Sequence, residues 1–252
     1  MALLWNHEAD GNRYEVRSAG ASLRLYRNGV NHSQWNPDRP LSGSVWDLIT
    51  LPALHRPRAS LSNALMLGFG AGTVARQLCD LAGVGRLVGV ELDPIHLSIA
   101  RGFFDCGDDC ELVAADAVAW VREESWRARY DLVIDDLYGE EEGVPQRFAP
   151  MDREWFAQVV SLLRPGGILV VNTIEPERVG RLPVLCDPQL SERLPHAVMY
   201  QIYGYENRVL AFSDKPFAAK ELDSALGRIC RDYPRCYGVG KRYQCVSPPS
   251  PV

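Results

Sequence analysis

The stretch LMLGFGAGTVARQL, residues 65–78, places glycines at three alternate positions, Gly68, Gly70 and Gly72. A short apolar run precedes them and a helix-like pattern follows. A glycine-rich turn between a buried strand and a helix lets a ligand approach the backbone, where N–H groups at the helix start face its polar end. Residues 70–75 also fit the GxGxxA pattern of dinucleotide-binding enzymes, so a nicotinamide or flavin enzyme is one alternative.

Strand-like and helix-like segments alternate after this turn, a pattern typical of βαβ units around a parallel sheet. Two later runs, 197–204 and 207–214, predict an antiparallel pair at one edge of that sheet. The expected parallel strands are 64–69, 86–92, 110–116, 130–136 and 167–174, and the expected helices are 73–82, 94–104, 117–125, 152–163 and 218–230.

The N-terminal residues predict a smaller β-region. Residues 13–31 alternate polar and apolar side chains around the turn signals Ala19-Gly20 and Asn28-Gly29. Residues 45–54 predict a lead-in helix before the polar break at 55–62. We therefore expect an α/β, Rossmann-like chain in three parts, namely a β-hairpin region with its lead-in helix (1–55), the ligand-binding domain (56–215) and a C-terminal helix with a tail (216–252).

The composition is that of an ordinary globular chain. Its 252 residues, 46% hydrophobic and 23% charged, suffice for a sizeable core. The net charge of −5 weighs against nucleic acid and is compatible with cationic substrates. No apolar run reaches transmembrane length, and the N-terminal run is too short for a signal peptide. We expect a cytoplasmic protein without membrane contact.

The seven cysteines are odd in number and scattered, and none forms a CxxC pair. Free thiols are the expected state in a reducing compartment. Cys106 and Cys110 have the spacing to share a metal, but the sequence offers no second pair or nearby histidine to complete a site. We expect no metal.

Acidic residues end two of the expected strands. Glu91 follows the glycine turn by about 20 residues, where a carboxylate can accept both hydroxyls of an adenosine ribose. Asp116 ends the next strand, and it either accepts a hydrogen bond from an adenine amino group, with the Ala117 N–H facing the ring, or caps the following helix. Asp93-Pro94 is expected to begin a helix.

A second acidic segment, YDLVIDDLYGEEEG, ends the fourth parallel strand. Asp135 and Asp136 reach the same sheet edge, and Tyr138 follows them. The run 140–142 is interpreted as a solvated surface, with replacement substrate contacts as the alternative.

The segments LGFGAG, VGVELDPIHLSIARGFF, ADAVAWV, YDLVIDD and LRPGGILVVN together resemble class I S-adenosylmethionine-dependent transferases, and more narrowly their spermidine synthase-like branch. RNGVNHSQW is similar to the N-terminal β-region of that branch, and the resemblance covers about residues 23–215. It implies a Rossmann-like, mostly parallel sheet with an antiparallel edge, and S-adenosyl-L-methionine or its decarboxylated form as donor.

The resemblance also implies roles for individual residues. Asp136 matches the aspartate with which aminopropyltransferases orient and deprotonate an attacking amine, and Tyr138 either assists it or merely lines the cleft. His32 is an alternative base or a surface histidine. The implied donor-binding residues are Gly68, Gly70 and Gly72 for the sulfonium part, Glu91 for ribose, Asp116 and Ala117 for adenine, and Gln34 beside the reacting group. Asp135 is also expected to bind the donor, from its own position where the fourth parallel strand meets the cleft.

The chain departs from the family where a polyamine would bind. After Asp136 the family has two small hydroxyl residues, a second Asp and Pro, whereas this chain has Leu137, Tyr138, Gly139 and Glu140. A Tyr-His-Glu signature after the glutamine and a late Pro-Thr-Tyr-Pro-like stretch are also absent. Because separated ammonium groups need carboxylates at matching distances, we expect methyl transfer to an unidentified small-molecule or protein acceptor.

Two alternatives remain open. One is aminopropyl transfer from decarboxylated S-adenosylmethionine to a polyamine, and the other is a non-catalytic binding or scaffold protein of the same fold. The resemblance is compatible with a homodimer.

Overall fold

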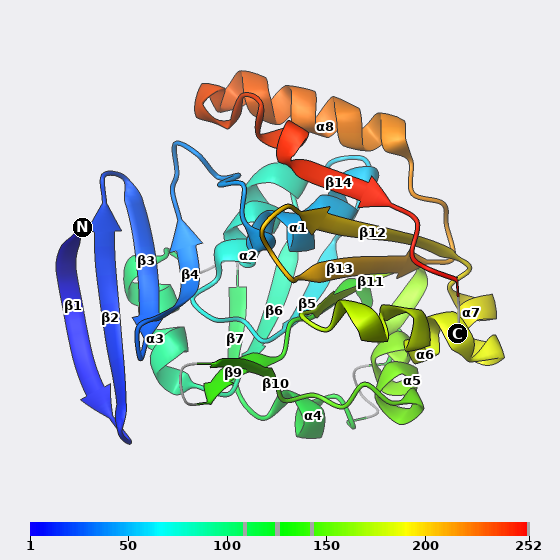
Figure 1. Cartoon of the computed structure of the whole chain (residues 1–252), viewed down its shortest axis with the longest axis horizontal. Helices are drawn as coiled ribbons and strands as arrows, with labels where there is room; N and C mark the ends of the chain where they lie inside the picture. Colours follow the sequence, from blue (N-terminus) through cyan, green and yellow to red (C-terminus); the bar gives the residue numbers. More distant parts are fainter. Residues whose placement is uncertain (108–109, 124–126, 142–143, 251–252) are drawn as a thin grey trace.

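The computed structural model describes residues 1–107, 110–123, 127–141 and 144–250. These residues form a large mixed sheet of eight strands, a four-stranded antiparallel sheet at the N-terminus and a separate two-stranded hairpin. Figure 1 shows the N-terminal sheet, in blue, standing to one side of the large sheet, with the long helix α8 (Ala219–Asp232) along another side.

The large sheet has a parallel centre and an antiparallel edge. Its strand order is β14-β12-β13-β11-β8-β5-β6-β7, in which the pairs from β11 to β7 are parallel and the remaining pairs are antiparallel. The predicted parallel strands and the predicted antiparallel edge are therefore confirmed. The strands are β5 (Asn63–Leu67), β6 (Arg86–Glu91), β7 (Cys110–Ala114), β8 (Tyr130–Asp135), β11 (Leu163–Thr173), β12 (His196–Ile202), β13 (Arg208–Ser213) and β14 (Tyr243–Val246).

Alternating side chains of the strands supply two hydrophobic cores, one on each face of the sheet. In β5, Ala64 and Met66 belong to the core that α1, α2, α3 and α8 cover, and Leu65 and Leu67 to the core under α4, α5, α6 and α7. The remaining α-helices are α1 (Val45–Thr50), α2 (Thr73–Gln77), α3 (Pro94–Phe103), α4 (Ala117–Trp120), α5 (Arg153–Ser161), α6 (Pro183–Cys186) and α7 (Pro188–Arg193). The 3₁₀ segments are η1 (Leu51–His55), η4 (Pro176–Arg181), η5 (Pro234–Cys236) and η6 (Val239–Arg242), and η2 (Leu78–Ala82) is a π-helical turn.

The N-terminal sheet is larger than predicted. β2 (Asn12–Ala19), β3 (Ser22–Arg27) and β4 (Val30–Trp35) pair around the two predicted turns, and Asn28 and Gly29 both have positive φ, as a tight hairpin turn requires. An unpredicted strand, β1 (Ala2–Ala9), adds to the outer edge. None of its residues is buried, so no hydrophobic alternation marks it in the sequence.

Three further segments differ from expectation. The predicted helix 117–125 is only the short α4. The acidic segment after β8 forms a hairpin of β9 (Tyr138–Glu141) and β10 (Val144–Arg147), where no strands were expected. β14 joins the sheet beside β12, so the part of the chain predicted as a helix and tail completes the central sheet. The three-part domain division itself stays a prediction.

A buried carboxylate joins the C-terminal residues to α1. Asp47 is fully buried and accepts hydrogen bonds from Gln77 Nε2 at 2.7 Å and from the Tyr243 hydroxyl at 2.7 Å. Burial raises the pKa of this carboxyl, and the hydrogen bonds oppose that rise. Asp47 thereby gathers segments from both ends of the described chain around the helix that precedes the glycine turn.

Helix starts follow the sequence closely. The Asp93 side chain accepts a hydrogen bond from the Ile95 N–H at 2.9 Å and Pro94 is the first helical residue, which confirms the predicted start of α3. Asp116 Oδ1 accepts from the Val118 N–H at 2.8 Å, so this residue does cap α4.

In the described part of the chain, no helix combines the length and apolar character needed to cross a membrane. Within the same ranges, no three or more His, Cys, Asp or Glu side chains are grouped so that they could hold a metal ion.

The three glycines are needed because other parts of the chain approach them. All three have positive φ. A Cβ on Gly68 would lie 2.1 Å from the Asp136 carbonyl oxygen, and one on Gly72 would lie 2.3 Å from Cys106 Sγ. One on Gly70 would lie 3.0 Å from Ser33 Oγ. Close packing of the turn against its neighbours thus accounts for the missing side chains before any ligand is considered.

We predict that Gly68→Ala destabilises the fold by roughly 2–5 kcal/mol, because it adds left-handed backbone strain and overpacking against main chain. Urea denaturation measures this free energy. The matched control is Gly102→Ala in α3, where a Cβ meets nothing within 4 Å and should stabilise by about 0.5–1 kcal/mol. Equal effects at the two positions would contradict the packing argument.

Candidate active site

A cavity of about 750 Å³ lies at the carboxyl edge of the parallel strands, where open α/β sheets bind ligands. The N-terminal sheet contributes one wall, through residues of β3 and β4, and the β9–β10 hairpin contributes another. The volume lies in the range of small-molecule sites. The predicted site residues that line this cavity are Gly68, Gly70, Glu91, Asp116, Ala117, Asp136 and Tyr138.

Hydrogen bonds to the Glu91 side chain connect the end of β6 to the glycine turn. Its Oε2 accepts hydrogen bonds from the Gly70 N–H at 2.7 Å and the Phe69 N–H at 3.1 Å, and its Oε1 accepts from the Asp93 N–H at 3.0 Å. Burial raises the pKa of this carboxyl, while the backbone donors oppose the rise. A carboxylate oxygen can accept more than one hydrogen bond, so the fixed carboxylate can still receive ligand hydroxyls.

Asp116 and Ala117 line the same cavity just after β7, the strand next to β6. The bonds from the Val118 and Ala119 N–H groups both end on Asp116 Oδ1. Oδ2 can therefore accept a further hydrogen bond while the helix stays capped. The two roles that the sequence left open, helix cap and ligand contact, are compatible in this geometry.

Asp136 is the carboxylate best suited to take up a proton. Its Oδ1 accepts from Asn172 Nδ2 at 2.8 Å, and its backbone N–H donates to the Leu67 carbonyl at 2.9 Å. Burial raises the pKa of Asp136 to about 6, and the nearby Asp135 charge raises it further, whereas Asn172 and Arg147 act in the opposite direction. A carboxyl with a pKa near the working pH is an effective general base.

Both hydrogen bonds of the Tyr138 hydroxyl go to main-chain groups, one in β11 and one in the residue after it. Its hydroxyl donates to the Asn172 carbonyl at 3.2 Å and accepts from the Ile174 N–H at 3.2 Å. Burial raises the pKa of this phenol, which therefore stays protonated near neutral pH. The arrangement favours the cleft-lining role over direct help in proton transfer.

Asp135 does not line the cavity in the described structure. It is fully buried, and its Oδ2 accepts from Trp155 Nε1 at 2.8 Å and from Arg147 Nη2. Successive residues at the end of a strand face opposite sides, so Asp136 reaches the cavity while Asp135 faces the core under α5. Its assignment to donor binding needs correction.

Arg147 gives Asp135 its charge partner. Only 6% of the Arg147 side chain is exposed, and its guanidinium lies 5.8 Å from the centre of the Tyr138 ring. It belongs to β10, so this buried ion pair holds the β9–β10 hairpin against the sheet. The sequence analysis did not anticipate this pairing, because it expected no strand around Arg147.

Gln34 also lies outside the cavity lining of the described residues, and His32 and Ser33 take its place. The pairing of β3 with β4 skips one residue, since Leu25 pairs with Ser33 and Tyr26 with Asn31. His32 is the extra residue of this β-bulge, a feature that re-aims side chains and often lies near active sites. The donor contact predicted for Gln34 therefore has no support from this geometry. The sequence analysis could not foresee this, because a bulge leaves no mark in the sequence pattern.

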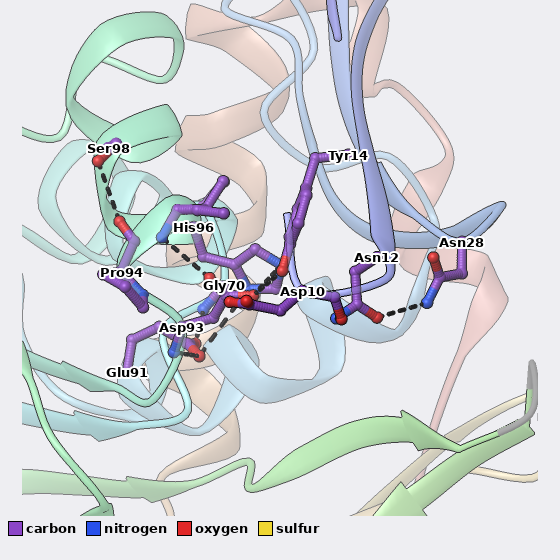
Figure 2. A network of polar contacts seen from close by, with 12 residues as sticks. Asp10, Asn12, Tyr14, Asn28, Gly70, Glu91, Asp93, Pro94, His96 and Ser98 are labelled. Atoms are coloured by element: carbon purple, nitrogen blue, oxygen red, sulfur yellow. Dashed lines mark hydrogen bonds and ion pairs between the residues drawn. The ribbon is translucent and has the colours of Figure 1, made fainter. Parts of the chain in front are cut away.

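His96 is a cavity residue that the sequence analysis missed. It lies in the first turn of α3, close to Asp93 and Glu91 (Figure 2). The centre of its ring is 5.2 Å from that of His32. Burial lowers the pKa of His96 to about 4, so the ring is neutral near pH 7. His96 follows the helix cap Asp93 by three residues, a spacing that puts two side chains on the same face of a helix. This spacing is the signal that would have placed His96 beside the sheet edge.

The cavity lining is rich in acids. Among its described residues it contains Glu91, Asp93, Asp116 and Asp136, against the single arginine Arg27. This balance favours a cationic ligand. The acidic run 140–142 does not enter the comparison, because its side chains lie outside the described residues.

Solved structures share this fold. A probable spermidine synthase from Corynebacterium glutamicum superposes with a TM-score of 0.71 at 19% identity, covering 97% of this chain and 91% of that one. Spermidine synthase from Thermotoga maritima gives 0.61 at 17% identity, covering 92% and 78%. The chain has the spermidine synthase-like fold. Human methyltransferase-like protein 13, in complex with SAH, gives 0.54 at 20% identity, covering 73% and 90%, and the Rossmann-like class I methyltransferase architecture is confirmed.

Curated relatives match part of the chain. A probable polyamine aminopropyl transferase of Bifidobacterium longum is 33% identical over 136 residues, 54% of this chain and 29% of that protein. The Mycobacterium tuberculosis polyamine aminopropyltransferase is 33% identical over 170 residues, 64% and 31%. Polyamine aminopropyltransferase 2 of Pseudomonas aeruginosa is 31% identical over 177 residues, 66% and 47%. The chain thus spans less than half the length of these three relatives, and no family model matches it.

These comparisons overturn the expected methyl transfer. The curated relatives above are named for aminopropyl transfer, and two of the three solved structures are named spermidine synthases. The preference for methyl transfer rested on the missing second carboxylate after Asp136, and that inference was wrong. One loop position does not decide the charge of a cavity that several strands line.

We predict that Arg147→Met costs about 3–5 kcal/mol of folding free energy, because it leaves the buried Asp135 carboxylate without its partner. Urea denaturation at pH 7.5 measures the cost, and the double variant Asp135→Asn/Arg147→Met should recover part of it. Arg178→Met, at the exposed pair Arg178–Glu175, is the control and should change stability little. Equal effects of the two single variants would contradict a stabilising role for the buried pair.

Proposed function

We propose that this chain transfers an aminopropyl group from decarboxylated S-adenosylmethionine to an amine acceptor of the polyamine class. The observation that carries the proposal is Asp136, a cavity carboxylate whose pKa is raised to about 6 and whose Oδ1 is fixed by Asn172. The names of the curated relatives support the same chemistry.

The cavity fits an adenosyl donor. Gly68 and Gly70 offer exposed backbone at its wall, and Glu91 and Asp116 offer carboxylate oxygens for hydroxyl and amino groups. Leu92, which is 73% exposed and also lines the cavity, offers an apolar surface for a purine ring. The sulfonium group of such a donor supplies an activated carbon, so the protein has to align the two substrates and exclude water.

Asp136 would act on the acceptor amine. The amine nitrogen forms a bond to the donor carbon next to sulfur while the carbon–sulfur bond breaks, and the thioether leaves. The proton that the nitrogen must lose goes to Asp136, whose Oδ2 is the oxygen not engaged by Asn172. With a pKa of about 6, Asp136 is mostly ionised near pH 7.5 and still basic enough to take the proton. The acidic lining offsets the remaining positive charge of a polyamine.

The test is a product assay with decarboxylated S-adenosylmethionine and a series of diamines, read by mass spectrometry, with S-adenosylmethionine as the control donor. We expect an aminopropylated amine and 5′-methylthioadenosine from the decarboxylated donor, and no product from the carboxylated one. Thermal stabilisation by the decarboxylated donor without product from any amine would instead support a non-catalytic binding protein.

We predict that the rate rises with pH through about 6, as Asp136 ionises, and that Asp136→Asn lowers it at least about 100-fold at pH 7.5. The folded-state pKa lies above the unfolded value of about 4, so this carboxyl contributes stability below pH 4 that is lost as the pH rises through 6. Asp136→Asn should therefore melt at a higher temperature than wild type at pH 8, and the difference should shrink toward pH 4.

The control for this variant is Asp223→Asn on the exposed face of α8, which should change neither the rate nor the pH dependence of melting. A pH profile of Asp136→Asn that still rises through 6 with near wild-type rates would rule out Asp136 as the base.

A further inference from the structure

The His96 ring carries hydrogen-bonding capacity that the protein leaves unused. Its side chain is 5% exposed and lines the cavity, yet within the described chain neither ring nitrogen has a hydrogen-bond partner. A neutral imidazole has one N–H donor and one acceptor nitrogen. Leaving both unsatisfied in a buried position is costly and rare, which indicates that an atom of a ligand completes one of them.

The neighbouring carboxylates are too far away to do so. His96 Nδ1 lies 3.8 Å from Glu91 Oε1, and Nε2 lies 3.8 Å from Asp93 Oδ2, both beyond hydrogen-bonding distance. Both oxygens also have other donors, since Glu91 Oε1 accepts from the Asp93 N–H and Asp93 Oδ2 accepts from the Tyr14 hydroxyl at 2.7 Å. Figure 2 shows His96, Glu91, Asp93 and Tyr14 converging beside Gly70.

The chemistry of this corner selects a hydroxyl group. The Glu91 carboxylate only accepts hydrogen bonds, whereas the neutral His96 ring can donate one. A hydroxyl can donate to Glu91 and accept from His96 at the same time, and with 3.8 Å between Oε1 and Nδ1 one oxygen can lie at about 2.8 Å from both. With the ring proton on Nδ1, an ammonium group could not accept from the ring, and an anion would be repelled by the two carboxylates.

We propose that His96 is a specificity-determining residue that, together with Glu91, binds one hydroxyl of the donor's ribose. This inference rests on the proposed adenosyl donor. Gly70 and Asp116 line the same cavity as Glu91. A nucleoside with its ribose at Glu91 would direct its sulfur end toward Gly70 and its base toward Asp116. The His32 ring, which belongs to the bulge of β4, closes the corner on the other side.

The neutral state of His96 suits this role. Burial lowers its pKa to about 4, the Asp93 charge acts against that shift, and the Arg27 charge adds to it. The ring therefore keeps one donor and one acceptor throughout the neutral pH range. Its place in the first turn of α3, which Asp93 caps, fixes the ring with respect to Glu91.

The test compares binding of 5′-methylthioadenosine with that of its 2′-deoxy and 3′-deoxy analogues, by calorimetry at pH 7.5. The proteins are wild type, His96→Leu and His96→Asn. We expect wild type to prefer the full ribose at least about 10-fold over one of the deoxy analogues. His96→Leu should lose about 10-fold for the full ribose and nothing for that analogue, and His96→Asn, which keeps a donor, should recover part of the loss.

The control is Ser98→Ala, on the exposed side of the same helix, which should leave all affinities unchanged. Equal weakening of all three nucleosides by His96→Leu would show a structural role only and would overturn the inference. So would wild-type binding without preference for any hydroxyl, and in that case the product assay can still support aminopropyl transfer. If wild type bound no nucleoside and formed no product, the proposed function would fall together with the inference.

Discussion

The carbonyl oxygen of Asp136 occupies the space that a side chain on Gly68 would need. This close approach joins the turn after β5 to the end of the neighbouring strand β8, and the Asp136 N–H donates to the Leu67 carbonyl at the same place. The backbone expected to face the donor and the carboxylate expected to receive the proton are therefore fixed with respect to each other by main chain. The main-chain part of this arrangement does not depend on flexible side chains, and the hydrogen bond from Asn172 holds the Asp136 carboxylate.

Two adjacent carboxylates at this point have opposite surroundings. Asp135 is paired with Arg147 and Trp155 inside the protein, whereas Asp136 faces the cavity with Asn172 as its partner. Because side chains alternate along a strand, the two carboxylates face opposite sides. Their different hydrogen-bond partners then give them different roles. Asp135 lies within a structural ion pair, whereas the pKa of Asp136 rises toward the range in which a proton can be exchanged.

The sequence predicted those parts of the molecule that repeat a local rule. Alternating β-branched runs, the Asp-Pro start of α3 and the hairpin turn at Asn28-Gly29 each follow from neighbouring residues, and the structure agrees with all three. The parts that it missed depend on distant or irregular contacts. β1 buries no residue, β14 needs the edge of β12, and the bulge at His32 exists only in the pairing of β3 with β4.

The candidate site divides in the same way. Glu91, Asp116 and Asp136 end parallel strands, and the topology alone brings them to one edge. Gln34 was assigned from the resemblance and Asp135 from its position at a strand end. Both lie elsewhere, because the bulge and the pleat decide which side chain enters the cavity. His96 was missed because its signal, the spacing of three residues from Asp93, was not used when the helix was predicted.

The hydrogen bond from Tyr243 to Asp47 has a consequence for synthesis on the ribosome. The two residues are separated by 196 positions, and Asp47 is fully buried in the finished fold. A chain that has emerged only as far as β13 can form the glycine turn and the parallel strands, and its Asp47 can already accept from Gln77 and from the Gly43 N–H, but the Tyr243 hydroxyl is still missing. The hydrogen bonding of this carboxylate is complete only when residue 243 arrives, so the nascent protein reaches its final packing late, after the cavity-forming strands are already in place.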